Sequence, residues 1–417
     1  MDSIHILGGV PLQGRVCIQG SKNAALPILA ATLLTKETSH IRNCPRISDV
    51  YKMISLLKSL GCRVKWVNDG LCVNTERVYG GNMPREAITA MRSSLCLLGA
   101  MLGRCREVVM EYPGGCVIGE RPIDLHIKAL QQMGVCFQEK KGRLHAYTKG
   151  LHGADIELPF ASVGATENII LAAVLAEGTT RIRRAAMEPE VVALCEYLSC
   201  CGACIEGSGA AEITITGKSR IYGVAYRVPS DRIVAGTYLF GCIGSGGNVL
   251  LENAPVKQMK SVLEVSKKLG AQWMNTKEGL YVQAPKRPRA IPFLQTQIYP
   301  GFPTDLQSAL LAVLTMAEGE SMIEETIFEN RFRVVEPLRH MGARLQIVDT
   351  QHVRIEGVDR LCGRDVEARE LRGGAALILA GMMAEGETVV RNCSYIYRGY
   401  ENICKDLREL GARIVSV

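Results

Sequence analysis

The chain has 417 residues, of which 47% are apolar, 22% are charged and 5% are aromatic. This length predicts two or three domains, and the apolar fraction suffices for sizeable cores, which excludes a disordered protein. The net charge of +7 comes without a dense Lys/Arg stripe interleaved with aromatic residues, which argues against nucleic-acid binding and suits a phosphorylated or carboxylated substrate.

The sequence also argues against a membrane or secretory destination. No window approaches 18 uncharged apolar residues, and residues 1–10 lack a basic patch followed by an apolar run. We therefore expect a cytoplasmic protein with no membrane span.

An internal repeat organises the whole chain. A short Leu-Gly, Met-Gly or Cys-Gly step closes an amphipathic helix pattern six times, and the intervals between these steps are all close to 70 residues. The glycines are Gly61, Gly134, Gly202, Gly270, Gly342 and Gly411. Two unrelated α/β domains would not explain this spacing. We predict six α/β units, three in each of two closed domains.

Each unit has two kinds of helix. Apolar patterns such as residues 169–178, 310–319 and 377–386 predict helices that are buried on all sides. The later pattern, such as residues 49–60, is amphipathic and predicts an outer helix that ends at the repeated glycine, where a left-handed backbone costs no Cβ clash.

The segment 19–24 is the first candidate for chemistry. Gly20 allows close backbone approach, and Lys22 is predicted near the N-terminus of the first buried helix, where amide dipoles attract anions. A capped helix start with a surface lysine also explains the Gly-Ser-Lys triplet at 20–22, and the triplet alone favours this simpler interpretation.

The second candidate is the segment 112–126, in which three glycines and two prolines lie within ten residues. Cys116 is predicted in this exposed loop, and the nearby Arg121 and His126 favour the thiolate. An incidental surface thiol is the alternative, but the glycines around the cysteine favour a functional one.

The third candidate is a set of arginines beside carboxylates in the second half. Arg331, Arg372 and Arg398 lie at related positions of three units, and guanidinium groups bind carboxylates and phosphates in bidentate fashion. Salt bridges between repeats explain any single arginine equally well. Together with Lys22 and Arg121, the three predict an anion site in a cleft between two domains.

These motifs resemble those of the UDP-N-acetylglucosamine enolpyruvyl transferases. The resemblance runs in order along the chain, and its specific mark is the Pro-Gly-Gly-Cys loop at 113–116, which the sister family of enolpyruvylshikimate-phosphate synthases lacks. The other matching segments are 20–23, 121–126, 162–166, 302–305 and 328–331.

The resemblance implies an α/β fold of two inside-out barrels, each with three repeats, helices inside and sheets outside. Residues 21–229 would form one domain, and residues 1–20 with 230–417 the other, with the active site in the cleft between them. It also implies transfer of the enolpyruvyl group of phosphoenolpyruvate to the 3-hydroxyl of UDP-N-acetylglucosamine, with release of phosphate. The resemblance also implies that this step opens peptidoglycan precursor synthesis, and it implies no metal or organic cofactor.

Residue roles follow from the same resemblance. Asp305 would be the base for the sugar hydroxyl, and Cys116 the acid for C3 of phosphoenolpyruvate. The phosphate would be held by Lys22, Arg121 and Arg398, and the carboxylate by Arg331 and Arg372, with Asn23 beside them. The nucleotide sugar would contact Arg92, Arg121, Pro122, Ile123, Asp124, Leu125, Ser162, Val163, Gly164, Asp305 and Ile327.

Four positions depart from the family pattern. Glu370 replaces the usual aspartate, Tyr395 and Tyr397 replace histidine and aspartate, and Phe160 stands where some members have a lysine. A transferase for shikimate phosphate is one alternative, against which the Cys116 loop argues. A catalytically weak or silent homologue that senses the nucleotide sugar is the other, against which retention of Lys22, Cys116, Asp305 and Arg398 argues.

Overall fold

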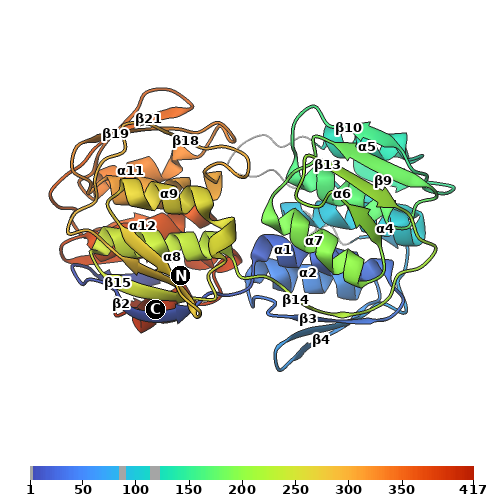
Figure 1. Ribbon diagram of the computed structural model, residues 1–417, viewed down its shortest axis with the longest axis horizontal. Coiled ribbons are helices and arrows are strands. Elements are labelled where there is room, and N and C mark those ends of the chain that lie inside the picture. The colour runs from blue at the N-terminus through green and yellow to red at the C-terminus, as the bar shows by residue number, and fades with distance from the viewer. Residues whose placement is uncertain (1–2, 84–90, 113–122) are drawn as a thin grey trace. The chain divides into compact units, whose positions relative to one another are not determined.

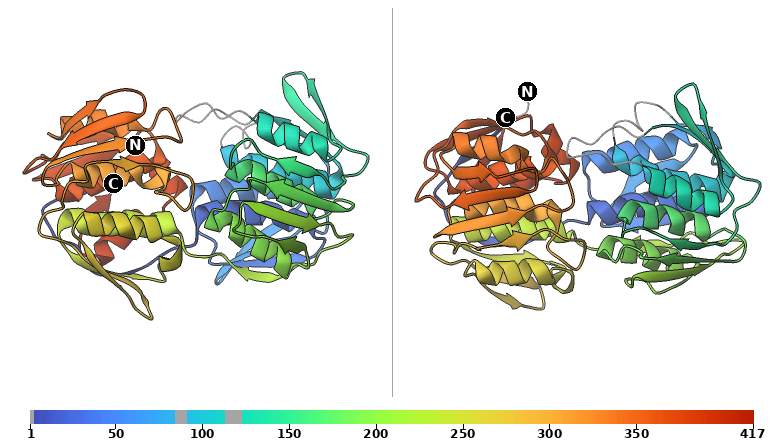
Figure 2. Two further views of the ribbon diagram at one scale, coloured as in Figure 1. Left: turned by 45° about the horizontal axis from the view of Figure 1, so that its top comes forward. Right: turned by 90° about the horizontal axis from the view of Figure 1, so that it is seen from above.

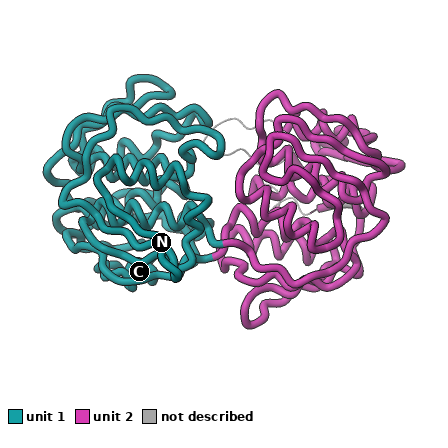
Figure 3. Tube along the Cα trace, in the orientation of Figure 1, with its two compact units in different colours: residues 1–19, 117–119, 230–417 teal, residues 20–116, 120–229 magenta. Residues whose placement is uncertain are grey.

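The computed structural model describes residues 3–83, 91–112 and 123–417 (Figure 1). The chain divides into two compact units (Figure 3). Among the described residues, unit 1 comprises residues 3–19 and 230–417, and unit 2 comprises residues 20–83, 91–112 and 123–229. None of the helices in these ranges has the length and apolarity needed to cross a membrane.

The described residues form six four-stranded sheets with one shared topology. In each sheet the first two strands in spatial order, or the last two, are parallel, and the remaining neighbours are antiparallel. Because the same pairing recurs six times, the structure confirms the predicted repeat and the α/β class.

The three sheets of unit 2 follow the chain order of its repeats. They consist of β14 (Ala225–Arg227), β3 (Thr38–Arg42), β5 (Gly70–Asn74) and β4 (Arg63–Val67); β6 (Gly81–Asn82), β7 (Glu107–Glu111), β9 (Arg143–Tyr147) and β8 (Cys136–Lys140); and β10 (Asp155–Glu157), β11 (Thr179–Arg183), β13 (Glu212–Thr216) and β12 (Cys204–Glu206).

Two of the three sheets of unit 1 include a strand from residues 3–19. They consist of β16 (Gln272–Asn275), β17 (Gly279–Gln283), β15 (Asn248–Glu252) and β2 (Gln13–Cys17); β18 (Leu294–Gln295), β19 (Glu320–Glu324), β21 (His352–Glu356) and β20 (Arg344–Ile347); and β22 (Asp365–Glu367), β23 (Glu387–Arg391), β1 (Ser3–Leu7) and β24 (Arg413–Ser416). β1 therefore lies between two strands from the last repeat.

Among the described residues, each unit has three nearly fully buried inner helices and three amphipathic helices. Figure 2 shows helices packed against the sheets of each unit. The inner helices are α1 (Lys22–Ala31), α4 (Cys96–Cys105) and α6 (Val163–Ala173) in unit 2, and α8 (Arg232–Ser245), α10 (Gln307–Leu314) and α12 (Leu371–Met383) in unit 1. The amphipathic helices are α2 (Ser48–Ser59), α5 (Asp124–Gln132), α7 (Pro189–Cys200), α9 (Lys260–Lys268), α11 (Val335–His340) and α13 (Ile403–Glu409).

The six repeated glycines end the amphipathic helices as predicted. All six have φ between +87° and +98°, the left-handed region that favours glycine. The described residues also include six short 3-10 helices: η1 (Thr32–Leu34), η2 (Arg92–Leu95), η3 (Val256–Gln258), η4 (Thr304–Leu306), η5 (Phe332–Val334) and η6 (Cys393–Arg398).

Within the described ranges, the chain passes between the units near Gly20 and again near Ser230. The backbone N–H of Ser21 donates to Pro229 at 2.8 Å in unit 2, and that of Asp231 donates to Gln19 at 2.9 Å in unit 1. The N-terminal crossing therefore has hydrogen bonds to the returning segment on both sides of Gly20 and Ser230.

Candidate active site

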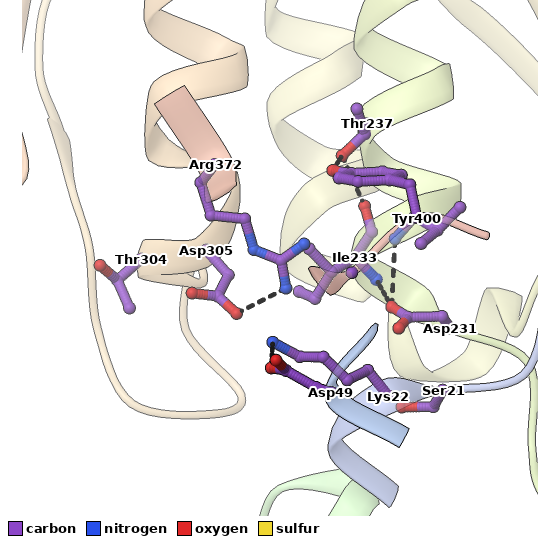
Figure 4. Close-up of polar contacts among 12 residues, drawn as sticks. Ser21, Lys22, Asp49, Asp231, Ile233, Thr237, Thr304, Asp305, Arg372 and Tyr400 are labelled. Carbon is purple, nitrogen blue, oxygen red and sulfur yellow. Dashed lines mark hydrogen bonds and ion pairs between the residues drawn. The ribbon is translucent and has the colours of Figure 1, made fainter. Parts of the chain in front are cut away.

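Asp305 is the centre of a charged cluster in unit 1. It lies in η4, directly before α10, and its Oδ1 accepts a hydrogen bond from Nη2 of Arg331 at 2.7 Å. Its Oδ2 accepts one from Nη2 of Arg372 at 2.9 Å (Figure 4). Both arginine side chains are 4% exposed, whereas that of Asp305 is 25% exposed. The structure thus brings these three predicted residues together, with a carboxylate that water reaches and two guanidiniums that it barely reaches.

Arg331 is held in place by a chain of hydrogen bonds. Its Nε donates to Oγ1 of Thr304 at 3.2 Å, and this hydroxyl donates to Oε2 of the buried Glu325 at 2.9 Å. Oε1 of Glu325 accepts from the backbone N–H groups of Ile327 and Phe328 at 2.9 and 3.3 Å. The hydroxyl proton goes to Glu325, so the oxygen of Thr304 keeps its lone pair for Arg331.

Glu370 positions Arg372. Its carboxylate is the N-cap of α12 and accepts from the backbone N–H of Arg372 at 2.7 Å and from that of Gly373. The carboxylate also lies 3.9 Å from Nη1 of Arg331. Arg372 lies in the first turn of α12, so its side chain projects from a buried helix and not from the loop before it. Glu370, which departs from the family pattern, here serves as a helix cap.

The environment of Arg372 keeps it charged. Burial lowers the pKa of its guanidinium, but the negative charge of Asp305 and the nearby Tyr400 and Asp231 outweigh this effect and raise the pKa above its ordinary value. Its Nη1 atom is buried and has no hydrogen-bond acceptor of good geometry among the described residues. This donor is therefore available to an anion that enters from outside the chain.

Arg398 ends the 3-10 helix η6 and is half-buried. The backbone after it is fixed by Gln19, whose Nε2 donates to the carbonyl of Gly399 at 3.2 Å and whose Oε1 accepts from Glu401 at 2.7 Å. Tyr395 and Tyr397, the two phenols before Arg398, are also half-buried, and Tyr397 packs against the core of unit 1. The ring of Tyr397 thus supports η6.

Lys22 is the first residue of α1 in unit 2. Ser21 is the N-cap of this helix, and its hydroxyl accepts from the backbone N–H of Ala24 at 3.4 Å. The ammonium of Lys22 lies 4.0 Å from Oδ2 of Asp49, and its side chain is 12% exposed (Figure 4). A Cβ on Gly20 would come within 1.8 Å of the carbonyl of Asn43, so only glycine fits at this approach.

The segments predicted to bind the nucleotide sugar lie at three helix starts in unit 2. The half-buried Arg92 opens η2, which runs directly into α4. Ile123 and Asp124 open α5, with Leu125 in its first turn. Ser162 is the N-cap of α6, followed by Val163 and Gly164, and its hydroxyl accepts from Ala165 at 3.4 Å.

The remaining predicted residues have different outcomes. Cys116, Arg121 and Pro122 lie outside the described residues. Asn23 is half-buried beside Lys22, and Ile327 is half-buried next to the Glu325 carboxylate. Phe160 is 62% exposed, two residues before the N-cap of α6.

Sequence reasoning did not single out several residues that build the cluster. Thr304 lies in the segment 302–305, but its position there predicts no role, and Glu325 lies in none of the matching segments. Glu325 lies six residues before Arg331, a spacing that carries no regular helix or strand signal. Asp49, which faces Lys22, sits in the first turn of an amphipathic helix, where an acidic residue is already explained by the helix dipole.

The chain matches known protein families along nearly its whole length. The family model described as EPSP synthase (3-phosphoshikimate 1-carboxyvinyltransferase) matches residues 6–407. A protein of Caldanaerobacter subterraneus subsp. tengcongensis, named UDP-N-acetylglucosamine 1-carboxyvinyltransferase 2, is 42% identical over 417 residues, which cover 100% of both chains. The UDP-N-acetylglucosamine 1-carboxyvinyltransferase of Methylacidiphilum infernorum is 43% identical over 420 residues and covers 100% of this chain and 99% of its own.

Solved structures share the fold. The enolpyruvyl transferase NikO from Streptomyces tendae aligns with a TM-score of 0.89 at 22% identity, over 100% of this chain and 99% of its own. An EPSP synthase from Acinetobacter baumannii aligns with a TM-score of 0.76 at 19% identity, over 100% of both chains. At these identities the likeness establishes the two-unit repeat fold alone.

Proposed function

Because the chain belongs to the UDP-N-acetylglucosamine 1-carboxyvinyltransferases within the EPSP synthase family, we propose that it transfers the enolpyruvyl group of phosphoenolpyruvate to the 3-hydroxyl of UDP-N-acetylglucosamine. The chain is thus a transferase, as its sequence motifs predicted. Its place is the first committed step of peptidoglycan precursor synthesis. The observation that carries the proposal within the fold is the Asp305 carboxylate between two buried guanidiniums.

The first proposed step is an addition. The oxygen of the sugar hydroxyl bonds to C2 of phosphoenolpyruvate while Asp305 accepts the proton of that hydroxyl, and Cys116 gives a proton to C3. In the second step C3 loses a proton, the bond from C2 to the phosphate oxygen breaks, and inorganic phosphate leaves. Asp305 is partly exposed and can therefore reach a substrate hydroxyl, whereas its arginine partners are buried.

The arginine cluster suits the carboxylate of phosphoenolpyruvate. We assign this carboxylate to Arg331 and Arg372, which in this structure bind the carboxylate of Asp305. The substrate would then take over one or both hydrogen bonds and release Asp305 for proton transfer. The free Nη1 donor of Arg372 supplies a first point of contact for the incoming anion.

The phosphate of phosphoenolpyruvate is assigned to Lys22, Arg121 and Arg398, with Asn23 beside Lys22. Positive charge around a substrate with both a phosphate and a carboxylate stabilises the charge that moves during addition. Lys22 belongs to unit 2 and Arg398 to unit 1, so the reaction needs groups from both. That they meet in one cleft stays a prediction, as does the cytoplasmic location.

The nucleotide sugar is assigned to the helix starts of unit 2, together with Asp305 and Ile327. Backbone N–H groups at the starts of α5 and α6 suit its diphosphate, because helix N-termini attract anions. Phe160 carries no charge that could aid this contact, and its exposed ring offers an apolar surface beside the start of α6.

Phosphate release tests the proposal directly. Purified protein is mixed with phosphoenolpyruvate and UDP-N-acetylglucosamine, and parallel samples omit the sugar or replace it with shikimate 3-phosphate. We expect release only with the nucleotide sugar, and a loss of about 10²- to 10⁴-fold in kcat for Asp305→Asn. Asp365→Asn, which alters an exposed pair with Arg391 at 2.8 Å, is the matched control.

Each result of this assay supports a different conclusion. Release only with the shikimate ester would overturn the substrate assignment. Binding of the nucleotide sugar without any release would favour a silent sensor, the alternative left by the departures at Glu370, Tyr395, Tyr397 and Phe160. Full activity of Cys116→Ala would remove the thiol from the mechanism.

A further inference from the structure

One buried carboxamide connects the three helix starts of unit 2. Asn168 lies in α6 and is 0% exposed. Its Oδ1 accepts from the backbone N–H of Gly99 in α4 at 2.7 Å, and its Nδ2 lies 3.0 Å from Nδ1 of His126 in α5. Nδ2 also donates to the carbonyl of Gly164, in the first turn of α6, at 3.3 Å. Figure 1 shows α4, α5 and α6 in the same part of unit 2.

The orientation of this carboxamide follows from its partners. A backbone N–H can only donate, so the atom that faces Gly99 is the oxygen and the atom that faces His126 is the amide nitrogen. Nδ1 of His126 must therefore accept, which places the proton of the neutral ring on Nε2. His126 is itself 7% exposed, so the pair is closed to water.

Asn168 and His126 are tightly packed. A Cβ on Gly99 would lie 2.3 Å from the carbonyl oxygen of Asn168, so α4 and α6 meet at backbone distance. A Cβ on Gly164 would lie 3.2 Å from Cε1 of His126. Because backbone and ring are in contact on both sides, a change in the carboxamide must be passed on to the helix starts.

Each of the three helices bears one segment assigned to the nucleotide sugar. Arg92 precedes α4 through η2, Asp124 and Leu125 open α5, and Gly164 belongs to the first turn of α6. Asn168 contacts all three helices, and in its own helix its Nδ2 donates directly to the carbonyl of Gly164, four residues earlier.

We propose that Asn168 and His126 are positioning residues that keep the three nucleotide-sugar segments at fixed positions relative to one another, an inference that rests on the proposed function. The Asn168 carboxamide supplies the link between the helices, and the Nδ1 acceptor of His126 completes it. Loss of this link separates the segments and weakens binding of UDP-N-acetylglucosamine. It leaves the Asp305 cluster, which belongs to unit 1, unchanged.

The test is a split between the KM values of the two substrates. Asn168→Leu removes both hydrogen-bonding groups at similar volume, and we expect KM for UDP-N-acetylglucosamine to rise about 5- to 100-fold. KM for phosphoenolpyruvate is expected to stay within about threefold. Calorimetric titration with UDP-N-acetylglucosamine measures the same loss without turnover.

Two conservative variants separate positioning from general stability. The Oδ1 of His126→Asn can replace the Nδ1 acceptor, whereas the longer His126→Gln places its amide nearer the Nε2 position. We expect the asparagine variant to bind the nucleotide sugar more tightly than the glutamine variant. Ser39→Ala is the structural control, since it removes a buried hydrogen bond to Tyr197 at 3.0 Å in the same unit.

The outcomes are distinct. An active wild type together with a folded Asn168→Leu that keeps its KM for the nucleotide sugar would overturn the inference alone. So would an equal rise in both KM values, a KM rise in Ser39→Ala of the same size, or equal binding by the two His126 variants. If Asn168→Leu does not fold, the two His126 variants decide. A wild type that neither turns over nor binds the nucleotide sugar would overturn the proposed function and this inference with it.

Discussion

We expect Glu167 to make the stability of unit 2 depend on pH. It lies in α6, is 5% exposed, and its Oε2 is 3.3 Å from Sγ of Cys96. Burial raises the pKa of its carboxyl from 4.5 to about 8, and the negative charges of Glu190 and Glu188 add to this effect. At neutral pH the folded protein therefore keeps a proton on Glu167 that the unfolded chain has already released.

The direction and size of the effect follow from this difference. Between pH 4.5 and about 8 the folded state binds one more proton than the unfolded state, so the free energy of unfolding falls as pH rises. Each pKa unit is worth about 1.4 kcal/mol, so the whole window costs about 5 kcal/mol. Glu167→Gln mimics the protonated side chain and removes this cost.

The chain allows each unit to be observed separately. It has two tryptophans, Trp66 in β4 of unit 2 and Trp273 in β16 of unit 1. In a Trp273→Phe background, urea unfolding followed by fluorescence reports on unit 2. We expect Glu167→Gln to match its parent near pH 5 and to be more stable by up to about 5 kcal/mol above pH 8.

The matched control is Glu206→Gln, which alters an exposed carboxylate in β12 of the same unit. Its pH profile is expected to run parallel to that of the parent. If the Glu167→Gln profile were also parallel to the parent, the carboxyl would be ionised in the folded state and the reasoning from burial would be wrong.

Three further predictions concern unit 1. Burial raises the pKa of Asp406 from 3.8 to about 6, so the free energy of unfolding falls as pH rises across that window, and Asp406→Asn should be more stable than its parent by up to about 3 kcal/mol above pH 6. Urea unfolding in the Trp66→Phe background measures this gain, and an unchanged midpoint would contradict the prediction. Arg372→Lys keeps the charge but loses the planar fork, so kcat/KM for phosphoenolpyruvate should fall at least about 100-fold, whereas Arg391→Lys at an exposed pair should leave it unchanged. Glu370→Ala removes the N-cap of α12 and should cost about 1 kcal/mol in urea unfolding and raise KM for phosphoenolpyruvate, because Arg372 loses its anchor; an unchanged KM would show that the cap does not position this arginine.

The repeat could be predicted because it depends on residues with local conformational requirements. A glycine such as Gly270 is required wherever a helix ends with a left-handed residue, and six such glycines at regular intervals mark six copies. The arginines of the site could also be chosen, since Arg331 and Arg372 stand in motifs at related positions.

The partners of these arginines could not be predicted. Glu325 reaches Arg331 only through the hydroxyl of Thr304, and Asn168 meets Gly99 only because two inner helices pack at backbone distance. Such contacts depend on how elements far apart in the sequence are packed, and a single sequence carries no periodic signal for them. Glu370 illustrates the same limit, because the sequence shows it only as a departure from the family pattern, whereas its role as a helix cap required the structure.

The interleaved chain order has a consequence for synthesis on the ribosome. The described residues of unit 2 all lie between residues 20 and 229, so they can pack together before most of unit 1 has been made. The strand β1 must instead wait for β23 and β24, almost the entire length of the chain later, which is roughly 20–80 s at ordinary rates of translation. During that interval both edges of β1 lack their partners, and its alternating apolar residues Ile4 and Ile6 have no core to enter. The nascent chain therefore exposes both edges of β1 until β23 and β24 have been made and have paired with it.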